Sequence, residues 1–486
     1  MGDARQITLT EMGRYRVGKS RFRGLRFLHT HLRGEPLSHD DLTDLALLRF
    51  DLIAALEAQE NGLPGRLHWA YLRPGAEDAE PWVVETPTTV HELELDFTQF
   101  ISDLEEEFAS LVHRSRKVGS NKKRAVLVGV TTDRLDQLEE NLEELRDLAE
   151  SAGLEVVDVV AQRRPRLDPK FVVGSGKMKE LYIHCMQKRA DMIVFEGELS
   201  GSQVRAISEF GDLEVWDRTQ LILEIFADRA QSRGGKLQVE LAMLKYSLPR
   251  LVLRDDFLSR LTGGIGARGP GETKIEELRR QVRDRIARLE RELEGLSRER
   301  ALRRTQRRRA GIPVVSIIGY TNAGKSTLLN TLTGSKVLAE NRLFATLDPT
   351  SRRLWLAPGR EAILTDTVGF IRELPDELAR AFRATLEELG EADLLLHLVD
   401  MSNPHFADQV MAVEQILADL ALDNLPVLMC FNKVDAVSPA ERADILATWT
   451  APAISARDPD SLRPLLTALE QALAACSAPQ PEETPA

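Results

Sequence analysis

Hydrophobic positions follow two alternating periods in the middle of the chain. Between residues 125 and 217, apolar runs such as AVLVGV, EVVDVVAQ and DMIVFEGE alternate with amphipathic stretches such as LDQLEENLEELRDLAESAG. Short apolar runs bounded by turn residues are typical of buried strands, and a 3.6-residue period is typical of helices. The alternation predicts a βαβαβαβ arrangement, a small parallel α/β domain over residues 117–224.

Two longer segments carry apolar residues at near-heptad spacing. Leucines recur at 4-3-4-3 spacing over residues 237–251, and leucine, isoleucine and valine do so over residues 275–296. Two such seams joined by a tight loop predict an antiparallel helical hairpin over residues 225–311. The loop GGIGARGPGETK (263–274) is then at or near its tip, and Pro249 is expected to kink the first arm.

The remaining segments complete the expected organisation. In the N-terminal extension, residues 1–116, the apolar spacing of LTDLALLRFDLIAALEAQ predicts a helix, and the polar, basic HRSRKVGSNKKR is interpreted as a linker. A GTPase-type α/β domain is expected over 312–476, and the Pro-rich tail 477–486 is expected to be disordered. The fold class is α/β: a P-loop domain, a small parallel domain with a hairpin, and an α+β extension.

Composition narrows the class of protein. The chain has 486 residues, of which 43% are hydrophobic and 29% charged, as in soluble multidomain proteins. Its longest apolar runs are strand-sized, and its first residues lack the apolar centre of a signal peptide. The three cysteines are scattered, with no CxxC pair. These features exclude a disulfide-rich or membrane-spanning class and predict a cytoplasmic protein, which we expect to be monomeric.

Charge is unevenly distributed. The net charge is −12, yet residues 268–310 hold 15 Lys and Arg against 8 Asp and Glu, a net charge of +7. A local positive segment can bind a polyanion whatever the overall sign.

The strand-like PVVSIIG leads into GYTNAGKST (319–327) and then into LLNTLTG. This is the G-x-x-x-x-G-K-[ST] pattern between a strand and a helix, the context that a P-loop requires. Backbone N–H groups of such a loop cradle the α- and β-phosphates. Lys325 is expected to reach the β- and γ-phosphates and Ser326 to bind Mg²⁺. The candidate nucleotide-binding residues here are Gly319, Tyr320, Thr321, Asn322, Ala323, Gly324, Lys325, Ser326 and Thr327.

Two further segments provide groups for Mg²⁺ and the γ-phosphate. In DTVGF, Asp366 follows a strand, where a carboxylate for Mg²⁺ is expected, and the Gly369 N–H is placed to sense the γ-phosphate. In NRLFATLDPT we expect Thr346, rather than Thr350, to contact both Mg²⁺ and the γ-phosphate. Either threonine could instead be only a turn residue. The candidate catalytic residues are therefore Lys325, Thr346 and Gly369, and the candidate Mg²⁺ ligands are Ser326, Thr346 and Asp366.

Guanine specificity is indicated by FNKVD and ISA. Asp435 can accept the guanine N1–H and 2-amino protons, a donor pair that adenine lacks. Lys433 can lie over the base, and Asn432 can tie this loop to the P-loop. Ser455 and Ala456 follow at a spacing that puts the Ala456 N–H on guanine O6. The order of these elements predicts a GTPase rather than an ATPase.

Longer strings make a family resemblance specific. GYTNAGKST, LFATLDPT, DTVGFIRELP, AFRATLEE, ADLLLHLVD and FNKVD resemble the HflX family of ribosome-associated GTPases. So do RPRLDPKFVVGSGKMKEL, DRTQLILEIFADRA, QVELAMLKYSLPRL and GGIGARGPGETK, and the resemblance covers roughly residues 120–474. It implies GTP hydrolysis on the large ribosomal subunit and splitting of stalled or idle ribosomes under stress. A ribosome assembly or quality-control factor that uses GTP as an occupancy switch is the alternative.

The resemblance also implies that the hairpin loop probes ribosomal RNA near the peptidyl-transferase region. Glycines in such a loop let backbone N–H groups approach phosphates, and the arms add basic residues. The alternative is that the arm arginines form a solvated face with acidic partners. The candidate RNA-binding residues are Gly263, Gly264, Gly266, Arg268, Gly269, Gly271 and Lys274, with arm residues Arg279, Arg280, Arg283, Arg285 and Arg288.

Two residues bear on the mechanism of hydrolysis. Phe370 stands where many small GTPases have a glutamine that orients water, so intrinsic hydrolysis is expected to be slow and to be stimulated by the ribosome. Asn322 matches a position that binds a monovalent cation in some related GTPases, or it could only brace the loop.

Two other motifs remain open. GSGK at Gly174 resembles the end of a P-loop but lacks the first glycine and the Ser/Thr, which favours a tight turn or an RNA-facing loop over a second nucleotide site. HTHLRGEPLSHDD, with His29, His31, Ser38 and Asp41, resembles the metal signature of JAMM-type isopeptidases. It has one residue fewer than that signature between the second histidine and the serine. Only Glu11 is available upstream as a catalytic glutamate. A working zinc site, a degenerate JAMM-like fold and coincidence are all open.

Overall fold

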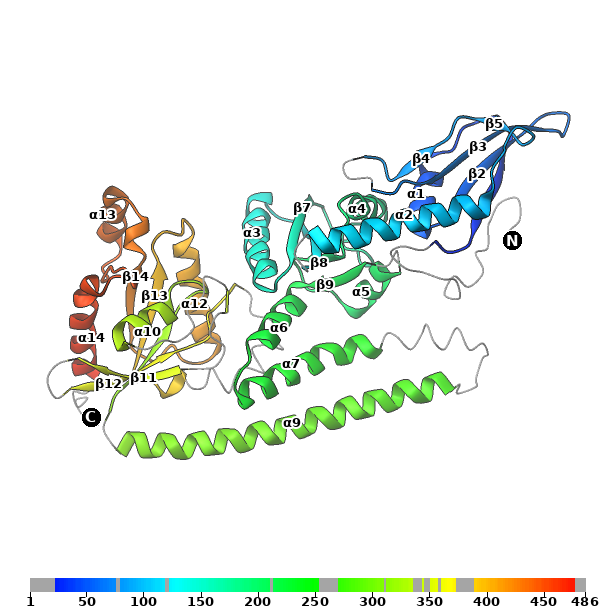
Figure 1. Cartoon of the computed structure of the whole chain (residues 1–486). Helices are drawn as coiled ribbons and strands as arrows, with labels where there is room; N and C mark the ends of the chain where they lie inside the picture. Colours follow the sequence, from blue (N-terminus) through cyan, green and yellow to red (C-terminus); the bar gives the residue numbers. More distant parts are fainter. Residues whose placement is uncertain are drawn as a thin grey trace. The chain divides into compact units, whose positions relative to one another are not determined.

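A computed structural model describes residues 22–75, 79–118, 122–209, 213–252, 270–309, 312–334, 343–344, 350–356, 360–372 and 389–476. The chain divides into two compact units, Met1–Arg218 and Thr219–Ala486 (Figure 1). Among the described residues, no helix combines the length and apolarity needed to cross a membrane.

The first unit begins with a small mixed sheet in strand order β1-β2-β3-β4, with β5 paired to β3. β1 and β2 are parallel, and the other pairs are antiparallel. Apolar residues of the sheet and of helix α1, including Ile53, Ala70 and Leu45, form a common core. The elements are β1 (Arg26–His31), α1 (His39–Leu48), β2 (Leu52–Ala58), β3 (Pro64–Leu72), β4 (Trp82–Val84), β5 (Thr88–Thr89) and α2 (Phe97–Val118).

Two expectations for this region are wrong. The helix expected over LTDLALLRFDLIAALEAQ ends at its C-cap Arg49, which has a left-handed φ of 49°. The apolar residues that follow form strand β2 between β1 and β3, where Ile53 and Ala55 are fully buried. A nearly continuous apolar run has no period that separates strand from helix, so the neighbouring strands decide. The expected linker also begins later, because α2 continues to Val118.

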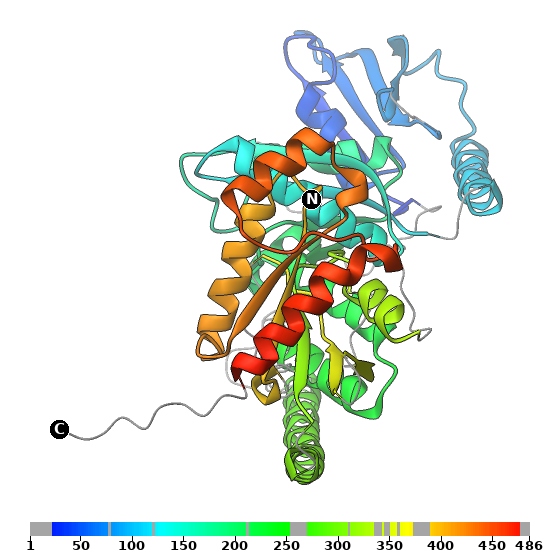
Figure 2. The same ribbon diagram turned by 90° about the vertical axis from the view of Figure 1, so that its left-hand side faces the viewer.

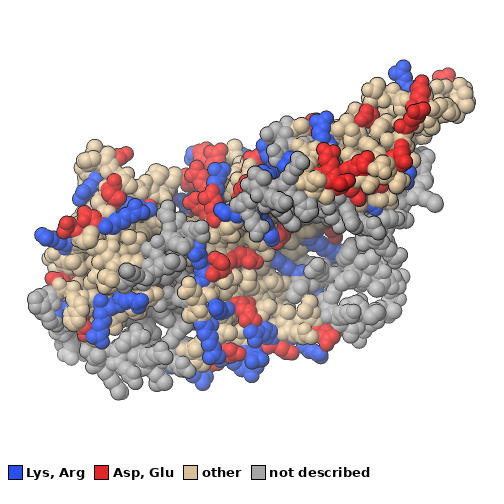
Figure 3. All heavy atoms as spheres, in the orientation of Figure 1, with Lys and Arg blue, Asp and Glu red and all other residues tan. Residues whose placement is uncertain are grey.

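The second sheet of this unit confirms the expected alternation of strands and helices. Its four strands are parallel, in the order β7-β6-β8-β9. Its elements are β6 (Arg124–Thr131), α3 (Leu135–Ser151), β7 (Glu155–Arg163), α4 (Ser175–Gln187), β8 (Met192–Phe195), α5 (Gly201–Ser208) and β9 (Glu214–Asp217). Leu138, Leu142 and Leu145 of α3 are buried, while exposed acidic residues of the same helix form a negative patch (Figure 3).

The hairpin consists of α7 (Arg233–Val252) and α9 (Pro270–Arg309), preceded by α6 (Arg218–Arg229). The helices are antiparallel: Glu240 contacts Arg285, and the earlier Arg233 contacts the later Glu292. Pro249 lies inside α7, near its end. Of the residues at the predicted near-heptad spacing, Leu241 and Leu289 are buried, whereas Leu278 is 43% exposed.

The remaining residues form a doubly wound domain around a five-stranded sheet, in the order β11-β12-β10-β13-β14, with only β11 antiparallel. The strands are β10 (Val314–Ile318), β11 (Thr350–Trp355), β12 (Glu361–Asp366), β13 (Leu394–Asp400) and β14 (Val427–Asn432). The helices are α10 (Lys325–Thr333), α12 (Phe406–Asp419), α13 (Pro439–Thr448) and α14 (Arg463–Cys476), with short 3-10 turns η2 (Leu389–Glu391), η3 (Val434–Ala436) and η4 (Pro459–Leu462).

Alternating side chains divide the core between the two faces of this sheet. Leu394, Leu396 and Leu398 of β13 pack in one cluster with residues of α10 and α14. Val399 packs with residues of α12 and α13 in another. Figure 2 shows α14 lying across the strands. The carboxyl ends of the parallel strands β10, β12 and β14 therefore meet at one edge, where ligands of such sheets bind.

Candidate functional site

The loop between β10 and α10 has a backbone that only glycine tolerates at two points. Gly319 has a φ of 144° and Gly324 a φ of 95°. A Cβ on Gly319 would collide with the Leu398 carbonyl oxygen, and one on Gly324 with the Asn432 side-chain amide. Asn322, between them, is exposed and has a left-handed φ of 60°. These conformations belong to the turn that joins the end of β10 to the N-terminus of α10, which is where the phosphate site of a P-loop lies.

The P-loop lysine is buried and folded back over its own loop. Lys325 Nζ donates to the carbonyl oxygens of Gly319 at 3.0 Å and Tyr320 at 2.8 Å. Burial lowers the pKa of Lys325 to about 8, although nearby Asp366 opposes the shift. Burial, followed by the charge of Lys325, lowers the pKa of His397 to about 4, so this imidazole is neutral near pH 7. His397 was not anticipated from the sequence, in which its place inside the apolar run ADLLLHLVD is the only signal.

The lowered pKa of Lys325 predicts a pH dependence of nucleotide binding. Bound phosphates favour the ammonium form, so above pH 8 binding must add a proton to Lys325. GDP affinity should therefore fall about tenfold between pH 7 and pH 9. Isothermal titration calorimetry in buffers of different ionisation enthalpy measures both the affinity and the proton uptake. Lys325→Arg is the matched control, because a guanidinium stays protonated over this range. An equal step in both proteins would contradict the assignment.

Two of the three expected Mg²⁺ ligands, Ser326 and Asp366, lie together at the end of β12. Ser326, in the first turn of α10, donates its hydroxyl proton to Asp366 Oδ2 at 2.6 Å. Asp366 is the last residue of β12 and is fully buried. A hydroxyl and a carboxylate are hard oxygen donors that suit Mg²⁺, so these two residues fit the expected ion. Thr346, the third expected ligand, lies outside the described residues, and Thr350 begins β11.

Gly369 and Phe370 pack directly against the P-loop. The Thr321 N–H donates to the Phe370 carbonyl oxygen at 2.8 Å. In return, the Phe370 N–H donates to the Gly319 carbonyl oxygen at 3.1 Å. A Cβ on Gly369 would lie 3.0 Å from Lys325 Nζ. The ring of Phe370 is buried, at 3% exposure. Phe370 is therefore a packing residue of the loop, and Gly369 lies beside the lysine that is expected to reach the γ-phosphate.

One asparagine links the P-loop to the two guanine-recognition segments. Asn432 Nδ2 donates to the Ala323 carbonyl oxygen at 2.7 Å, and Asn432 Oδ1 accepts the Ala456 N–H at 2.8 Å. Thr331 of α10 also donates its hydroxyl proton to the Ala456 carbonyl oxygen at 2.6 Å. The Ala456 N–H, expected to reach guanine O6, is thus already engaged with Asn432 and can bind the base only by sharing or releasing this bond.

The expected base-reading carboxylate is held ionised. A hydrogen bond from Ser455 lowers the pKa of Asp435, with smaller contributions from the charges of Arg457 and Lys433. Lys433 has a left-handed φ of 63°, and its ammonium lies 2.7 Å from Asp400 Oδ2. Asp400 ends β13 and was not anticipated from the sequence. An ionised, exposed carboxylate can accept hydrogen bonds from the two N–H donors of guanine, N1–H and the 2-amino group.

The expected RNA-binding loop falls largely outside the described residues. This applies to Gly263, Gly264, Gly266, Arg268 and Gly269. Gly271 and Lys274 belong to the backbone of α9, which begins at Pro270, so the assignment of these two residues to the loop is wrong. Proline at the first helical position is favourable because its missing N–H is not needed there.

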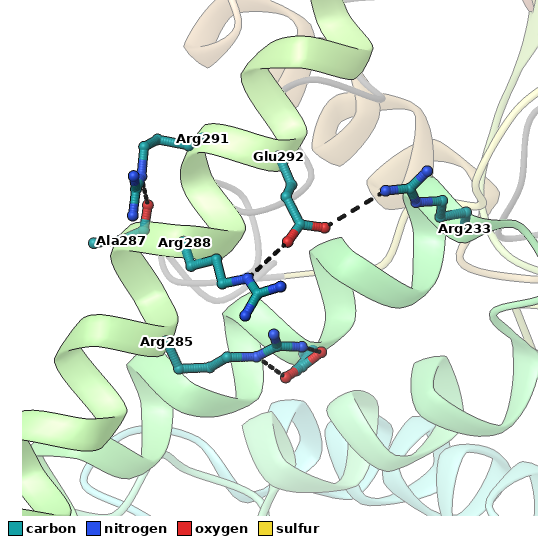
Figure 4. A network of polar contacts seen from close by, with 7 residues as sticks. Arg233, Arg285, Ala287, Arg288, Arg291 and Glu292 are labelled. Atoms are coloured by element: carbon teal, nitrogen blue, oxygen red, sulfur yellow. Dashed lines mark hydrogen bonds and ion pairs between the residues drawn. The ribbon is translucent and has the colours of Figure 1, made fainter.

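Two of the arm arginines pair with acidic residues. Arg285 donates from Nε and Nη2 to Glu240 of α7, at 2.7 and 2.8 Å, and Arg288 Nε donates to Glu292 at 3.2 Å (Figure 4). Charges of both signs are interspersed along the helix pair on the face shown in Figure 3. The interpretation as a paired, solvated face therefore holds for these two arginines.

The segment GSGK at Gly174 is the start of a helix. Gly174 caps α4 with a φ of 88°, and the preceding Val173 carbonyl oxygen accepts a hydrogen bond from Arg164. Met178, which replaces the Ser/Thr of a P-loop, is fully buried in the core. The geometry favours the tight-turn interpretation over a second nucleotide site.

Three family models match the chain between residues 139 and 433. Residues 139–227 match the N-terminal region of GTP-binding GTPases, residues 229–307 match their middle region, and residues 314–433 match a 50S ribosome-binding GTPase domain.

Curated relatives match over most of their length. The GTPase HflX of Caldanaerobacter subterraneus subsp. tengcongensis is 47% identical over 360 residues, which cover 74% of this chain and 82% of the relative. The GTPase HflX of Escherichia coli is 43% identical over 318 residues, covering 65% and 74%. A crystal structure of a GTP-binding protein from Sulfolobus solfataricus with GDP aligns at 24% identity and a TM-score of 0.39, over 73% of this chain and 98% of that one.

Proposed function

This chain belongs to the HflX family, a GTP-binding and ribosome-associated family of GTPases, and we propose that it uses GTP on the large ribosomal subunit to split stalled or idle ribosomes under stress. GTP hydrolysis follows from the family. The large-subunit site, the splitting of ribosomes and stimulation of hydrolysis by the ribosome are the proposed parts.

The observation that carries the nucleotide assignment is the joining of three distant segments by Asn432. Its amide holds the P-loop at Ala323 and the ISA segment at Ala456, with Asp435 three residues later in the chain. We assign binding of the phosphates to residues 319–327 and recognition of guanine to Asp435. The hydrogen bond from Ser455 orients Asp435, and we assign Lys433 to the face of the base.

The chemistry assigned to the chain is positioning and charge stabilisation. Members of this family of GTPases generally use Mg²⁺, which would be held by Ser326 and Asp366, with Thr346 as the proposed third ligand. Lys325 and the Gly369 N–H would stabilise charge on the γ-phosphate. Phe370 is buried and has no group that could orient water, which supports a slow intrinsic rate raised by the ribosome. A monovalent cation beside Asn322 is a further proposed cofactor.

The proposed contact with ribosomal RNA is the end of the hairpin. The match of residues 314–433 to a 50S ribosome-binding domain supports the partner, and the net charge of +7 over residues 268–310 suits a polyanion. Because Arg285 and Arg288 are paired with glutamates, we assign the contact to residues 263–269 with Lys274, not to these two arginines. We further propose that the protein acts as a cytoplasmic monomer.

Sedimentation of 70S ribosomes through a sucrose gradient tests the proposal. With the protein and a non-hydrolysable GTP analogue, we expect 70S particles to convert to subunits and the protein to sediment with the 50S peak. Lys325→Ala is the matched control, which should leave 70S particles intact because it removes the phosphate-binding ammonium. Stable binding to precursor particles without splitting would favour the assembly-factor alternative. Ribosomes that neither bind the protein nor dissociate would refute the central claim.

A further inference from the structure

Two side chains of strand β1 and one of helix α1 converge on one point, far along the sequence from the nucleotide site. His29 and His31 lie on the same face of β1, and Asp41 lies in the first turn of α1. His29 Nε2 is 2.9 Å from His31 Nε2 and 3.5 Å from Asp41 Oδ1. One ligand atom from each residue lies within 4.8 Å of the other two. The family matches begin at residue 139, so they do not include this cluster.

Neighbouring groups orient two of these side chains. His31 Nδ1 lies 2.7 Å from the Glu35 carbonyl oxygen, so Nδ1 carries the proton and Nε2 presents its lone pair to the cluster. Asp41 Oδ2 accepts the Ser38 N–H at 2.8 Å and the Ser38 hydroxyl proton at 2.7 Å, which leaves Oδ1 facing His29. Hydrogen bonds to the atoms of a side chain that do not bind the metal fix the tautomer and the orientation of a metal ligand.

The separations of the donor atoms fit a tetrahedral ion. Bonds of about 2.0–2.1 Å to zinc at tetrahedral angles place ligand atoms about 3.3 Å apart. The two distances at His29, 2.9 and 3.5 Å, lie on either side of this value. Two imidazoles with one carboxylate select a zinc-like divalent ion, because Mg²⁺ and Ca²⁺ prefer sites made only of oxygen.

We propose that His29 Nε2, His31 Nε2 and Asp41 Oδ1 bind one divalent transition-metal ion of the zinc class. Three protein ligands leave a fourth position for water or for a donor from another molecule. His29 and Asp41 side chains are each 18% exposed, so an ion can enter from solvent. The competing explanation is that His29 simply donates a hydrogen bond to His31, while Ser38 and Asp41 form only the capping box of α1.

Metal analysis of the full chain, purified without a histidine tag, tests the site. After stripping with EDTA and dialysis against Zn²⁺, we expect about one zinc per chain by mass spectrometry. Co²⁺ in its place should give the strong visible absorption of a four-coordinate ion. The double variant His29→Ala/His31→Ala should lose both signals. The control His91→Ala, which removes an exposed histidine outside the cluster, should keep both.

Two further measurements separate ligand loss from misfolding. Asp41→Asn keeps the shape of the side chain and should weaken zinc affinity about tenfold or more, because it removes the charged donor. Circular dichroism and GDP affinity should match the wild type in every variant. Wild type holding less than about a tenth of an equivalent of zinc would overturn the proposal. So would unchanged zinc content in the double histidine variant, or an Asp41→Asn affinity equal to that of wild type.

Discussion

Asp435→Asn should change the base preference of this protein from guanine to xanthine. The carboxylate of Asp435 can accept two protons, from guanine N1–H and from the 2-amino group. Asparagine offers one acceptor and one donor, so its amide would face the 2-amino group with a like donor. Xanthine carries an oxygen at that position and restores the pair. Because an unmatched polar group in such a site costs several kcal/mol, GTP affinity should fall at least ~100-fold.

Dissociation constants for GTP and XTP, measured by calorimetry on both proteins, check this result. Asp458→Asn is the matched control: Asp458 caps η4 through the Asp460 N–H and is exposed. It should leave both affinities unchanged. A GTP affinity of Asp435→Asn within a few-fold of the wild-type value would show that another group reads the base.

Replacing residues 263–269 with a serine-rich segment of equal length should abolish ribosome splitting and leave GTP binding unchanged. The segment lies between α7 and α9, whereas the described contacts of the nucleotide site come from residues 319–461. Stopping at residue 269 keeps Pro270, which begins α9. Loss of the glycines removes backbone N–H groups that could approach RNA phosphates, and loss of Arg268 removes a charge.

Gradient sedimentation of 70S ribosomes and GDP calorimetry on the same preparation measure the two effects. The same serine-rich segment placed over residues 477–483 of the tail serves as control and should retain splitting. Reduced GDP affinity in the loop variant would show that the two loops are not independent. Full splitting activity would show that the RNA contact lies elsewhere.

The sequence determined the elements whose chemistry lies within short contiguous strings. The P-loop at 319–327 needs glycines, lysine and serine at fixed spacing between a strand and a helix. Those local requirements can be recognised directly in the amino-acid sequence. The βαβαβαβ alternation over 125–217 was predicted correctly because each strand and helix has its own clear period. His29 and His31 share a face of β1 for the same local reason, since alternate residues of a strand point the same way.

Tertiary structure decided what depends on partners distant in sequence. The run LIAALEA became β2 because β1 and β3 pair with it, and its own spacing fits either structure. For Arg285 the sequence left both an RNA contact and a paired, solvated face open, and the hydrogen bond to Glu240, 45 residues earlier, decides for the pair. Asn432 reaches Ala323 across 109 residues. The burial that lowers the pKa of Lys325, and the approach of Asp41 to His29, likewise arise only when separate elements pack together.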